Sequence, residues 1–500
     1  MISHNDSDRS GRLRALVASS VGVATGIFVF AAAAGLLGSW RAAAPVAAIV
    51  AGLVGRLVYR RPIVALDESA CTRGLKIISG IATVVALVQL GRLAVFMVDP
   101  AEVGYSAVPT SRWEIQHSCL SAYFVSAEAA SSAQDVYDDS LFTMPNDDAT
   151  KPRNARMLGP FKIDVFEYPP PYLLLPRALR LLTPDFMRLR MLWFGLSGGV
   201  VLLAFLVVAR SLGPAASTRA LLLSPIIWVP ISTLSSLQKG NVQLMVIAAS
   251  MLAMGLFERR RWAAGGALLA FVTMSKLYPG MLVVYLLARR EWRAVGWTAA
   301  LGVAFLAVSL VDTGWAPYPA FLQHLPGILG GEAFPAFRNP AATAINLSVP
   351  GIVFKLKLFG VPGMGFGASK IAGWCYTLVA VAATFFAGRR PIEDHEKPLA
   401  WLAILILATL RSPFLPVVYA AFPAVWLLTV VAAQAAPTAK NLAIMLLAWA
   451  ALSVYWPIDW PLDPRLLAVA TAVPQTAIVV LAILVLRRRS VRSSIPLSAR

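Results

Sequence analysis

Apolar runs repeated along the whole chain constrain this sequence more than any other feature. About 20 consecutive apolar residues are needed for a helix to cross a bilayer. Only 14% of the 500 residues are charged, and the mean hydropathy is +0.69, whereas soluble proteins carry about 25% charged residues. The sequence therefore predicts an all-α polytopic membrane protein with about 12–14 transmembrane helices. The expected spans are 15–37, 43–59, 75–97, 190–210, 217–236, 241–257, 262–275, 278–288, 294–312, 369–388, 398–411, 414–433, 441–456 and 465–486.

Basic residues gather in short clusters between these runs. The formal net charge of +19 could suggest a nucleic-acid partner, but clusters of this kind are typical of cytoplasmic loops. We therefore expect membrane lipids and no nucleic acid as partners. The clusters are Arg9/Arg12/Arg14, Arg56/Arg60/Arg61/Arg73/Lys76, Arg259–Arg261, Arg289/Arg290/Arg293, Arg389/Arg390 and Arg487–Arg489 with Arg492.

All the clusters lie on one side only if 262–288 and 398–433 each enter the membrane and return. Prolines break both segments, at Pro279 after Lys276 and at Pro413 after Arg411. This topology places both termini in the cytoplasm, with 15–37 as an uncleaved first helix. It places the long polar loop 98–190 and the loop 313–368 on the far face of the membrane.

Three cations at the far-face turns are candidate ligands for an anionic headgroup, because an ionisable residue at membrane depth is costly. Lys276 and Arg411 lie at the helix breaks, and Lys239 lies in a short turn. A lipid phosphate is the anion that they would suit. The alternative is that each side chain only extends to the interface, which for Lys239 is the favoured interpretation.

The polar loop supplies the candidate acid–base groups. Asp99 directly follows the span 75–97, where a carboxylate can act as a general base on a hydroxyl group. His324, in the other far-side loop, is the second catalytic candidate. Glu167 and Tyr168 lead into a rigid run of prolines.

Metal and disulfide chemistry are not predicted. Cys71, Cys119 and Cys375 are far apart, and no His/Asp/Glu spacing resembles a zinc site. No glycine-rich phosphate loop is present. We therefore expect neither a metal nor a cofactor.

Several short motifs, taken in order, resemble glycosyltransferase family 87, a family of the GT-C class of membrane glycosyltransferases related to polyprenyl-phosphate-mannose-dependent mannosyltransferases. They cover roughly residues 75 to 430. The motifs are Asp99, Ser121–Phe124, Val136–Asp138, Tyr168–Pro170 with Pro176, Gly240–Gln243, Ala263–Gly266, Lys276–Pro279, Asn346–Ser348 and Arg411–Pro413.

Two motifs depart from the family pattern. The family often has Gly-Gln-x-Asn where this chain has Gln238-Lys239-Gly240-Asn241, and a histidine in the motif after Ser412-Pro413 is missing here. Because of these two departures, the resemblance does not determine which donor sugar and which acceptor this chain uses.

The resemblance implies a GT-C-like fold in a bacterial inner membrane, with the active site and a long first core loop on the periplasmic face. It also implies three regions. Residues 1–74 would form the cytoplasmic N-terminus and a helical hairpin, which lies outside the resemblance. Residues 75–433 would form the catalytic core with loops 98–190 and 313–368. Residues 434–500 would form C-terminal transmembrane helices and a basic tail.

The implied reaction moves a sugar, such as mannose, from a polyprenyl-phosphate donor to a hydroxyl group of a lipid or glycan acceptor, with inversion. Asp99 would be the base, and His324 would orient donor or acceptor. Lys276, Arg411 and Lys239 would hold the phosphate as its charge develops. The implied substrate-binding residues are Glu167, Tyr168, Tyr278, Asn241 and Asn346.

Two other classes remain open. Transporters or flippases also place charges at broken helices, but they rarely need a loop of about 90 residues, since long loops usually carry a function of their own. A scaffold within an envelope complex has no distinguishing feature here.

Overall fold

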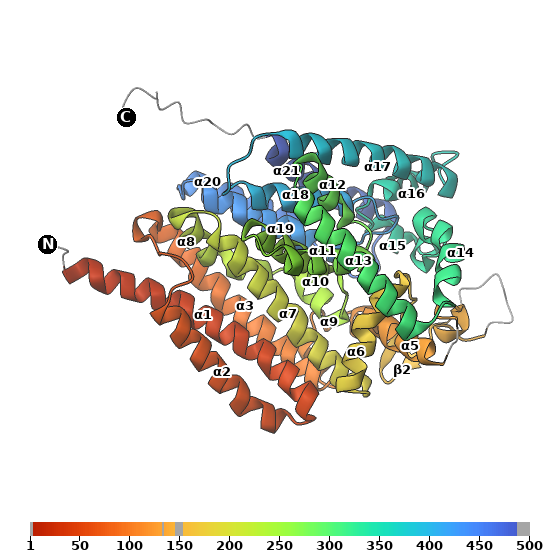
Figure 1. The fold of residues 1–500 in the computed structure, drawn as a ribbon, viewed down its shortest axis with the longest axis horizontal. Coiled ribbons are helices and arrows are strands. Elements are labelled where there is room, and N and C mark those ends of the chain that lie inside the picture. The colour runs from red at the N-terminus through yellow and green to blue at the C-terminus, as the bar shows by residue number, and fades with distance from the viewer. Residues whose placement is uncertain (1–3, 133–134, 146–153, 488–500) are drawn as a thin grey trace.

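The computed structural model describes residues 4–132, 135–145 and 154–487. The structure is 75% helical and its few strands are very short (Figure 1), which confirms the all-α polytopic class. Eight of the described helices are long and apolar enough to cross a membrane. They are α1 (His4–Leu37), α2 (Trp40–Arg60), α3 (Arg73–Val98), α7 (Phe186–Arg210), α13 (Trp292–Thr313), α17 (Phe366–Arg389), α19 (Val417–Gln434) and α21 (Pro464–Arg487).

Shorter helices account for the other expected spans. The pair α8 (Pro214–Leu223) with η5 (Ser224–Trp228) and α9 (Ile231–Lys239) is bent by 66° and counts as a ninth span at most. The rest are α10 (Gln243–Glu258), α11 (Trp262–Ser275), α12 (Gly280–Ala288), α18 (Lys397–Thr409) and α20 (Ala439–Ser453). The longest of these has 16 residues and covers about 24 Å at 1.5 Å per residue. Length alone therefore supports fewer full spans than the 12–14 expected, although every expected segment overlaps a helix.

Some short helices are apolar on every side because they lie at the centre of the bundle. Every residue of α18 from Pro398 to Thr409 is buried, and most of α19 is buried as well. A helix enclosed by protein needs no polar face. These helices therefore form the core around which the longer ones pack.

The N-terminal helices α1 and α2 lie side by side on one flank of the bundle, where α1 packs against α3 and α7 and α2 lies outside α1 (Figure 1). Gly195 on α7 lets α1 approach closely, because a Cβ there would lie 2.4 Å from the carbonyl oxygen of Phe28. A Cβ at Gly198 would lie 2.0 Å from the Phe28 ring. The hairpin is thus docked by backbone contact with the core.

Connections that carry basic clusters meet at one end of the bundle. The contacts that join them are Asp67 to Thr218, Arg219 to Ala433, Gln434 to His395, Arg390 to Leu486, and the ion pair of Lys397 with Glu258. The short turn η1 (Glu68–Ala70) belongs to the same end. The basic tail beyond Arg487 lies outside the described residues.

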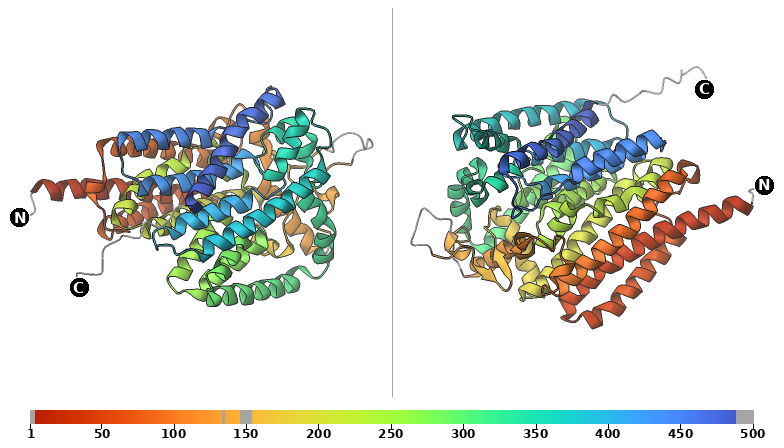
Figure 2. Two further views of the ribbon diagram at one scale, coloured as in Figure 1. Left: turned by 90° about the horizontal axis from the view of Figure 1, so that it is seen from above. Right: turned by 180° about the vertical axis from the view of Figure 1, so that it is seen from behind.

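The polar stretch after α3 folds at the opposite end, together with α14 (Pro317–Gly330) (Figures 1 and 2). A small sheet of order β1-β3-β2 ties this region together. Strand β1 (His117–Ser118) runs parallel to β3 (Phe161–Ile163), and β2 (Met157–Leu158) is antiparallel to β3. The other elements are η2 (Val103–Tyr105), α4 (Arg112–Gln116), α5 (Cys119–Ser131), η3 (Asp139–Leu141), η4 (Pro170–Leu173), α6 (Leu174–Leu182), η6 (Pro335–Arg338), α15 (Pro340–Ala344) and α16 (Val349–Leu358). The two large loops expected on one face therefore do lie at one end.

Candidate active site

An aromatic wall made by Tyr123, Phe166, Tyr168 and Tyr172 forms the inner side of the polar region. The Tyr168 ring centroid lies 4.8 Å from that of Tyr172 and 5.0 Å from that of Tyr123. The hydroxyl groups of Tyr123 and Tyr168 are 2.8 Å apart, and Tyr137 donates a 2.7 Å hydrogen bond to the Tyr168 carbonyl. The prolines that follow Tyr168 begin η4 and fix its direction. Tyr168 is therefore held from both its ring and its backbone.

Lys276 reaches this wall from the break between α11 and α12. Its ammonium nitrogen lies 5.3 Å from the centroid of the Tyr168 ring, within cation–π range. Within the described residues Lys276 forms no ion pair, while it interacts electrostatically with Glu167 and Cys119. The side chain is only partly buried. A cation without an ion-pair partner beside an aromatic wall suits a bound anion.

Glu167 adds little negative charge next to Lys276. Burial raises the pKa of Glu167 well above its ordinary value, and Asp164 raises it further, although Lys276 acts in the opposite direction. These effects favour the neutral acid. The positive charge of Lys276 is therefore left largely uncompensated.

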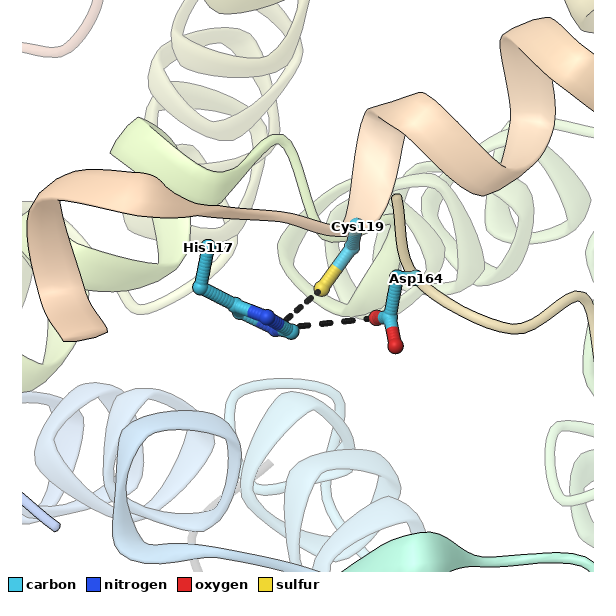
Figure 3. A group of neighbouring side chains, drawn as sticks. All are labelled: His117, Cys119 and Asp164. Carbon is cyan, nitrogen blue, oxygen red and sulfur yellow. Dashed lines mark hydrogen bonds and ion pairs between the residues drawn. The ribbon is translucent and has the colours of Figure 1, made fainter. Parts of the chain in front are cut away.

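His117, Cys119 and Asp164 form a tight cluster beside the wall (Figure 3). The His117 Nε2 lies 3.6 Å from the Cys119 Sγ and 3.6 Å from an Asp164 carboxylate oxygen. Pairing of β1 with β3 sets His117 opposite Lys162, two residues before Asp164. Burial lowers the pKa of His117, against the opposite effect of Asp164, and it raises the pKa of the Cys119 thiol to about 12. Both groups are therefore neutral at pH 7 unless a cation binds them.

Asn241 joins this cluster to the membrane helices. Its side-chain amide donates a 3.3 Å hydrogen bond to the Cys119 Sγ, and its carbonyl oxygen accepts one from the Gln243 N–H at the start of α10. On the other side, the Tyr419 hydroxyl lies 3.1 Å from the same sulfur. The expected substrate-binding Asn241 is thus buried and holds Cys119 in place.

Lys239 has a different partner from the one expected. Its ammonium group forms a 2.7 Å ion pair with Glu114, and both side chains are fully buried. Ser235 and Tyr455 also donate to the Glu114 carboxylate, and the Trp113 ring lies 4.2 Å from the ammonium nitrogen. The charge of Lys239 is therefore already compensated, and its contacts tie α9 to α4 and the C-terminal segment.

Arg411 and Asn346 belong to a second polar group. Asn346 donates to the Pro413 carbonyl at 2.9 Å and accepts from the Leu415 N–H at 2.9 Å, so it locks the turn that follows Arg411. The Arg411 guanidinium donates to the Thr377 hydroxyl at 2.6 Å and lies over Trp374 of α17. Within the described residues no hydrogen bond or ion pair joins Arg411 to Lys276.

The remaining candidates lie at the edges. Asp99 is exposed at the end of α3, where its carboxylate accepts a hydrogen bond from the Ala101 N–H, and no described contact links it to the cluster. His324 is exposed on α14 and stacks on Tyr137, which in turn binds the Tyr168 backbone. The buried hydroxyl group of Tyr278 has no hydrogen-bond partner among the described residues.

The sequence interpretation missed the cluster of His117, Cys119 and Asp164. Its only local signal is the presence of His117 and Cys119 two positions apart, where the short strand β1 passes directly into α5. Asp164 is 45 positions further along the chain from Cys119, and only the pairing of β1 with β3 brings it near.

Comparison with known proteins gives one match. The family model of glycosyltransferase family 87 matches residues 166–415. The matched part begins at Phe166 of the aromatic wall and ends just after the Arg411 turn. No curated protein and no solved structure matches the chain.

Proposed function

The chain belongs to glycosyltransferase family 87, and from this premise we propose that it transfers a hexose such as mannose from a polyprenyl-phosphate donor to a hydroxyl acceptor. Membership of this family makes it a membrane glycosyltransferase, which takes a sugar from a donor to an acceptor substrate. A donor with a lipid tail would reach the site directly from the bilayer. The observation that carries the proposal is the uncompensated charge of Lys276 at the aromatic wall.

Lys276 would bind the phosphate of the donor. In the transfer, the bond between the anomeric carbon and the phosphate oxygen breaks, and negative charge grows on the leaving phosphate. A fixed cation stabilises that charge in the transition state more than in the ground state. The neutral acid of Glu167 would donate a hydrogen bond to the same phosphate.

A carboxylate near the wall would accept the proton of the acceptor hydroxyl. Asp164 is the better placed candidate, because it neighbours both His117 and Glu167 and its side chain is 35% exposed. Asp99, the base expected from the sequence, would need the acceptor to bind at the end of α3. Direct attack by the acceptor with a single displacement would invert the anomeric centre.

The other candidates have supporting roles in this proposal. The aromatic wall would exclude water from the donor, which limits its hydrolysis. Asn241 and Asn346 would hold the cluster and the Arg411 turn in place, and Tyr278 would offer its hydroxyl group to the sugar. Arg411 would bind a second anionic group of the donor or acceptor, and His324 would line the entrance next to Tyr137.

We also propose the side of the membrane on which this takes place. Basic connections meet at one end of the bundle and the site lies at the other, and cationic loops tend to stay in the cytoplasm. Both termini would then be cytoplasmic in a bacterial inner membrane, and the site would be periplasmic. Residues 75–433 would form the catalytic core. The segment 434–500 supports it, because Tyr455 and Asp459 bind Glu114 and Ser111.

The test is to incubate the purified full-length protein with a panel of polyprenyl-phosphate sugars and candidate lipid acceptors, and to measure released polyprenyl phosphate. The proposal predicts release that depends on an acceptor. A chain that moved such lipids without breaking them would release none, which would overturn the proposal in favour of a transporter or flippase.

Two matched variants separate the candidate bases in the same assay. Loss of a general base typically costs about 10²–10⁴-fold in rate. We expect Asp164→Asn to lose turnover by such a factor and Asp99→Asn to keep most of it, with Glu102→Asn as a control at an exposed position. The reverse order would return the role to Asp99.

A further inference from the structure

We propose that His117, Cys119 and Asp164 form a site for a divalent transition-metal ion, with Zn²⁺ as the best fit. Figure 3 shows the three side chains pointing toward one another from β1, from the first turn of α5 and from the residue after β3. Their ligand atoms all lie within 4.8 Å of one another.

The distances suit one ion shared by three ligands. Zinc bonds of about 2.3 Å to sulfur and about 2.0–2.1 Å to nitrogen and oxygen, at tetrahedral angles, place the ligand atoms about 3.3–3.6 Å apart. The Nε2 to Sγ distance is 3.6 Å, and the Nε2 to Asp164 distance is also 3.6 Å. The three ligand atoms lie within 4.8 Å of one another, so binding an ion would draw Cys119 and Asp164 together by up to about 1.2 Å.

Hydrogen bonding explains the cluster less well. The Nε2 of His117 and the Asp164 carboxylate are 3.6 Å apart. An N–H···O hydrogen bond usually spans about 2.7–3.2 Å between the same kinds of atom. In a nucleophilic triad the nucleophile and the carboxylate contact different nitrogens of the imidazole ring. Here both the thiol and the carboxylate face the same nitrogen, Nε2. This convergence is what a metal requires and what a triad does not provide.

The backbone holds the three ligands before any ion binds. The Ser121 hydroxyl donates to the Ser118 carbonyl and accepts from the Asp164 N–H at 3.0 Å, so it clamps α5 to the residue after β3. Trp113 stacks on the His117 ring with centroids 4.4 Å apart. Such pre-organisation reduces the ordering cost of binding.

Outer contacts also match a metal–thiolate. The Asn241 amide donates to the Cys119 Sγ, and the Tyr419 hydroxyl lies within hydrogen-bonding distance of it. Donors around a ligating atom are a common feature of metal sites, where they orient the ligand. These contacts come from α19 and from the turn before α10, so the ion would link the polar region to the membrane helices.

The ligand types select the ion. A thiolate, an imidazole and a carboxylate together favour zinc over magnesium or calcium, which prefer oxygen ligands. Three protein ligands leave a fourth position open, as in catalytic zinc sites. Lys276 interacts electrostatically with Cys119, so a cationic side chain lies near the proposed site.

The experiment measures metal binding rather than activity, so its outcome is independent of the proposed sugar transfer, in which Asp164 would act as the base of the metal-free protein. Purified full-length protein in detergent is stripped with a chelator and titrated with Co²⁺, the spectroscopic substitute for zinc. Cobalt bound to a thiolate gives a charge-transfer absorption band. We expect one equivalent of cobalt, this band, and displacement of cobalt by added Zn²⁺.

Variants assign the ligands. Cys119→Ser should abolish the band, whereas Cys71→Ser and Cys375→Ser, which change the two other free cysteines, should keep it. Asp164→Asn and His117→Gln should each weaken cobalt binding at least tenfold while leaving the thermal unfolding of the chelated protein close to that of the wild type. Absence of stoichiometric binding by the wild type, or an unchanged band in Cys119→Ser, would overturn the proposal.

Discussion

Lys276 differs from Lys239, the other lysine expected to bind the phosphate, in what surrounds its charge. Lys239 is fully buried and paired with Glu114 at 2.7 Å. Lys276 lies against the Tyr168 ring and interacts with Glu167. Burial raises the pKa of Glu167, which favours the neutral form of its carboxyl group. The two lysines therefore suit different tasks, one structural and one for binding an anion.

Replacing Lys276 with methionine removes the charge but keeps most of the side-chain volume. We expect donor binding to weaken about tenfold to a hundredfold, because a charge-assisted hydrogen bond is worth about 1.5–3 kcal/mol. Titration with a non-hydrolysable polyprenyl-phosphate sugar analogue measures this directly. Lys162→Met, at an exposed cation in β3, is the matched control. Equal donor affinity in the two variants would contradict the role of Lys276.

Glu167 provides a prediction on pH. Its pKa is raised above the ordinary value of 4.5, so the folded protein binds this proton more tightly than the unfolded chain does. The contribution of this proton to the free energy of unfolding is fully present at low pH. It is lost as the pH rises from about 4.5 through the pKa that Glu167 has in the folded protein.

The variant Glu167→Gln is neutral at every pH and should remove that loss. We expect it to be more stable than the wild type at neutral pH, with a flatter dependence of the unfolding midpoint on pH above about 4.5. Thermal unfolding in detergent across this pH range is the measurement. The exposed control Glu102→Gln should follow the wild-type profile, and a Glu167→Gln profile as steep as that of the wild type would refute the argument.

At the scale of elements, the buried pair of Lys239 and Glu114 connects helices that are far apart in sequence. Glu114 on α4 receives contacts from Lys239 and Ser235 on α9 and from Tyr455 after α20. The Gln238 side chain adds a hydrogen bond to the Glu114 carbonyl and another to the Ala107 N–H. This network fixes the polar region onto the bent span α8–α9.

Breaking one side of that pair should destabilise the protein. Lys239→Met leaves the Glu114 charge buried without an opposite charge, which costs about 3–5 kcal/mol. The exposed pair of Lys370 and Glu332 is the control, and Lys370→Met should cost less than about 1 kcal/mol. Thermal unfolding compares the two, and adding Glu114→Gln to Lys239→Met should restore part of the loss. Equal effects of Lys239→Met and Lys370→Met would show that the buried pair is not structural.

At the scale of the whole molecule, the N-terminal hairpin is packed onto the core rather than loosely attached. Its helix α1 contacts α7 so closely at Gly195 and Gly198 that a single added methyl group would meet the main chain or the ring of Phe28. The hairpin lies outside the matched residues 166–415, yet it covers α7, which begins just after the polar region.

Gly195→Ala should therefore loosen the hairpin. Its Cβ would lie 2.4 Å from a backbone oxygen that cannot move alone, and overpacking of this kind costs about 1–3 kcal/mol. Gly199→Ala is the control on the same helix, since nothing lies within 4 Å of its added Cβ, and it should be neutral or slightly stabilising. We expect a lower unfolding temperature and faster protease cleavage after α2 in Gly195→Ala alone. If both variants behave alike, the close contact of α1 with α7 has no energetic importance.

The sequence by itself determined the class of this protein and the location of its helices. Apolar runs place each expected span on a helix, because the bilayer admits helices whose backbone groups are satisfied internally. Order and composition of the short motifs also predicted glycosyltransferase family 87, which the match over residues 166–415 confirms. The number of full spans was less well determined, because α18 and its neighbours are apolar from burial in protein rather than from contact with lipid.

Only the tertiary structure decided which polar residues meet. Asp99 is the base predicted from the sequence, because it directly follows a span, and it lies at the exposed end of α3. Asp164 reaches His117 and Cys119 through the pairing of two very short strands, and Lys239 meets Glu114 across 125 positions. Contacts of this kind depend on long-range packing, which leaves no periodic signal in the sequence. The His117, Cys119 and Asp164 cluster therefore becomes visible only in the folded chain.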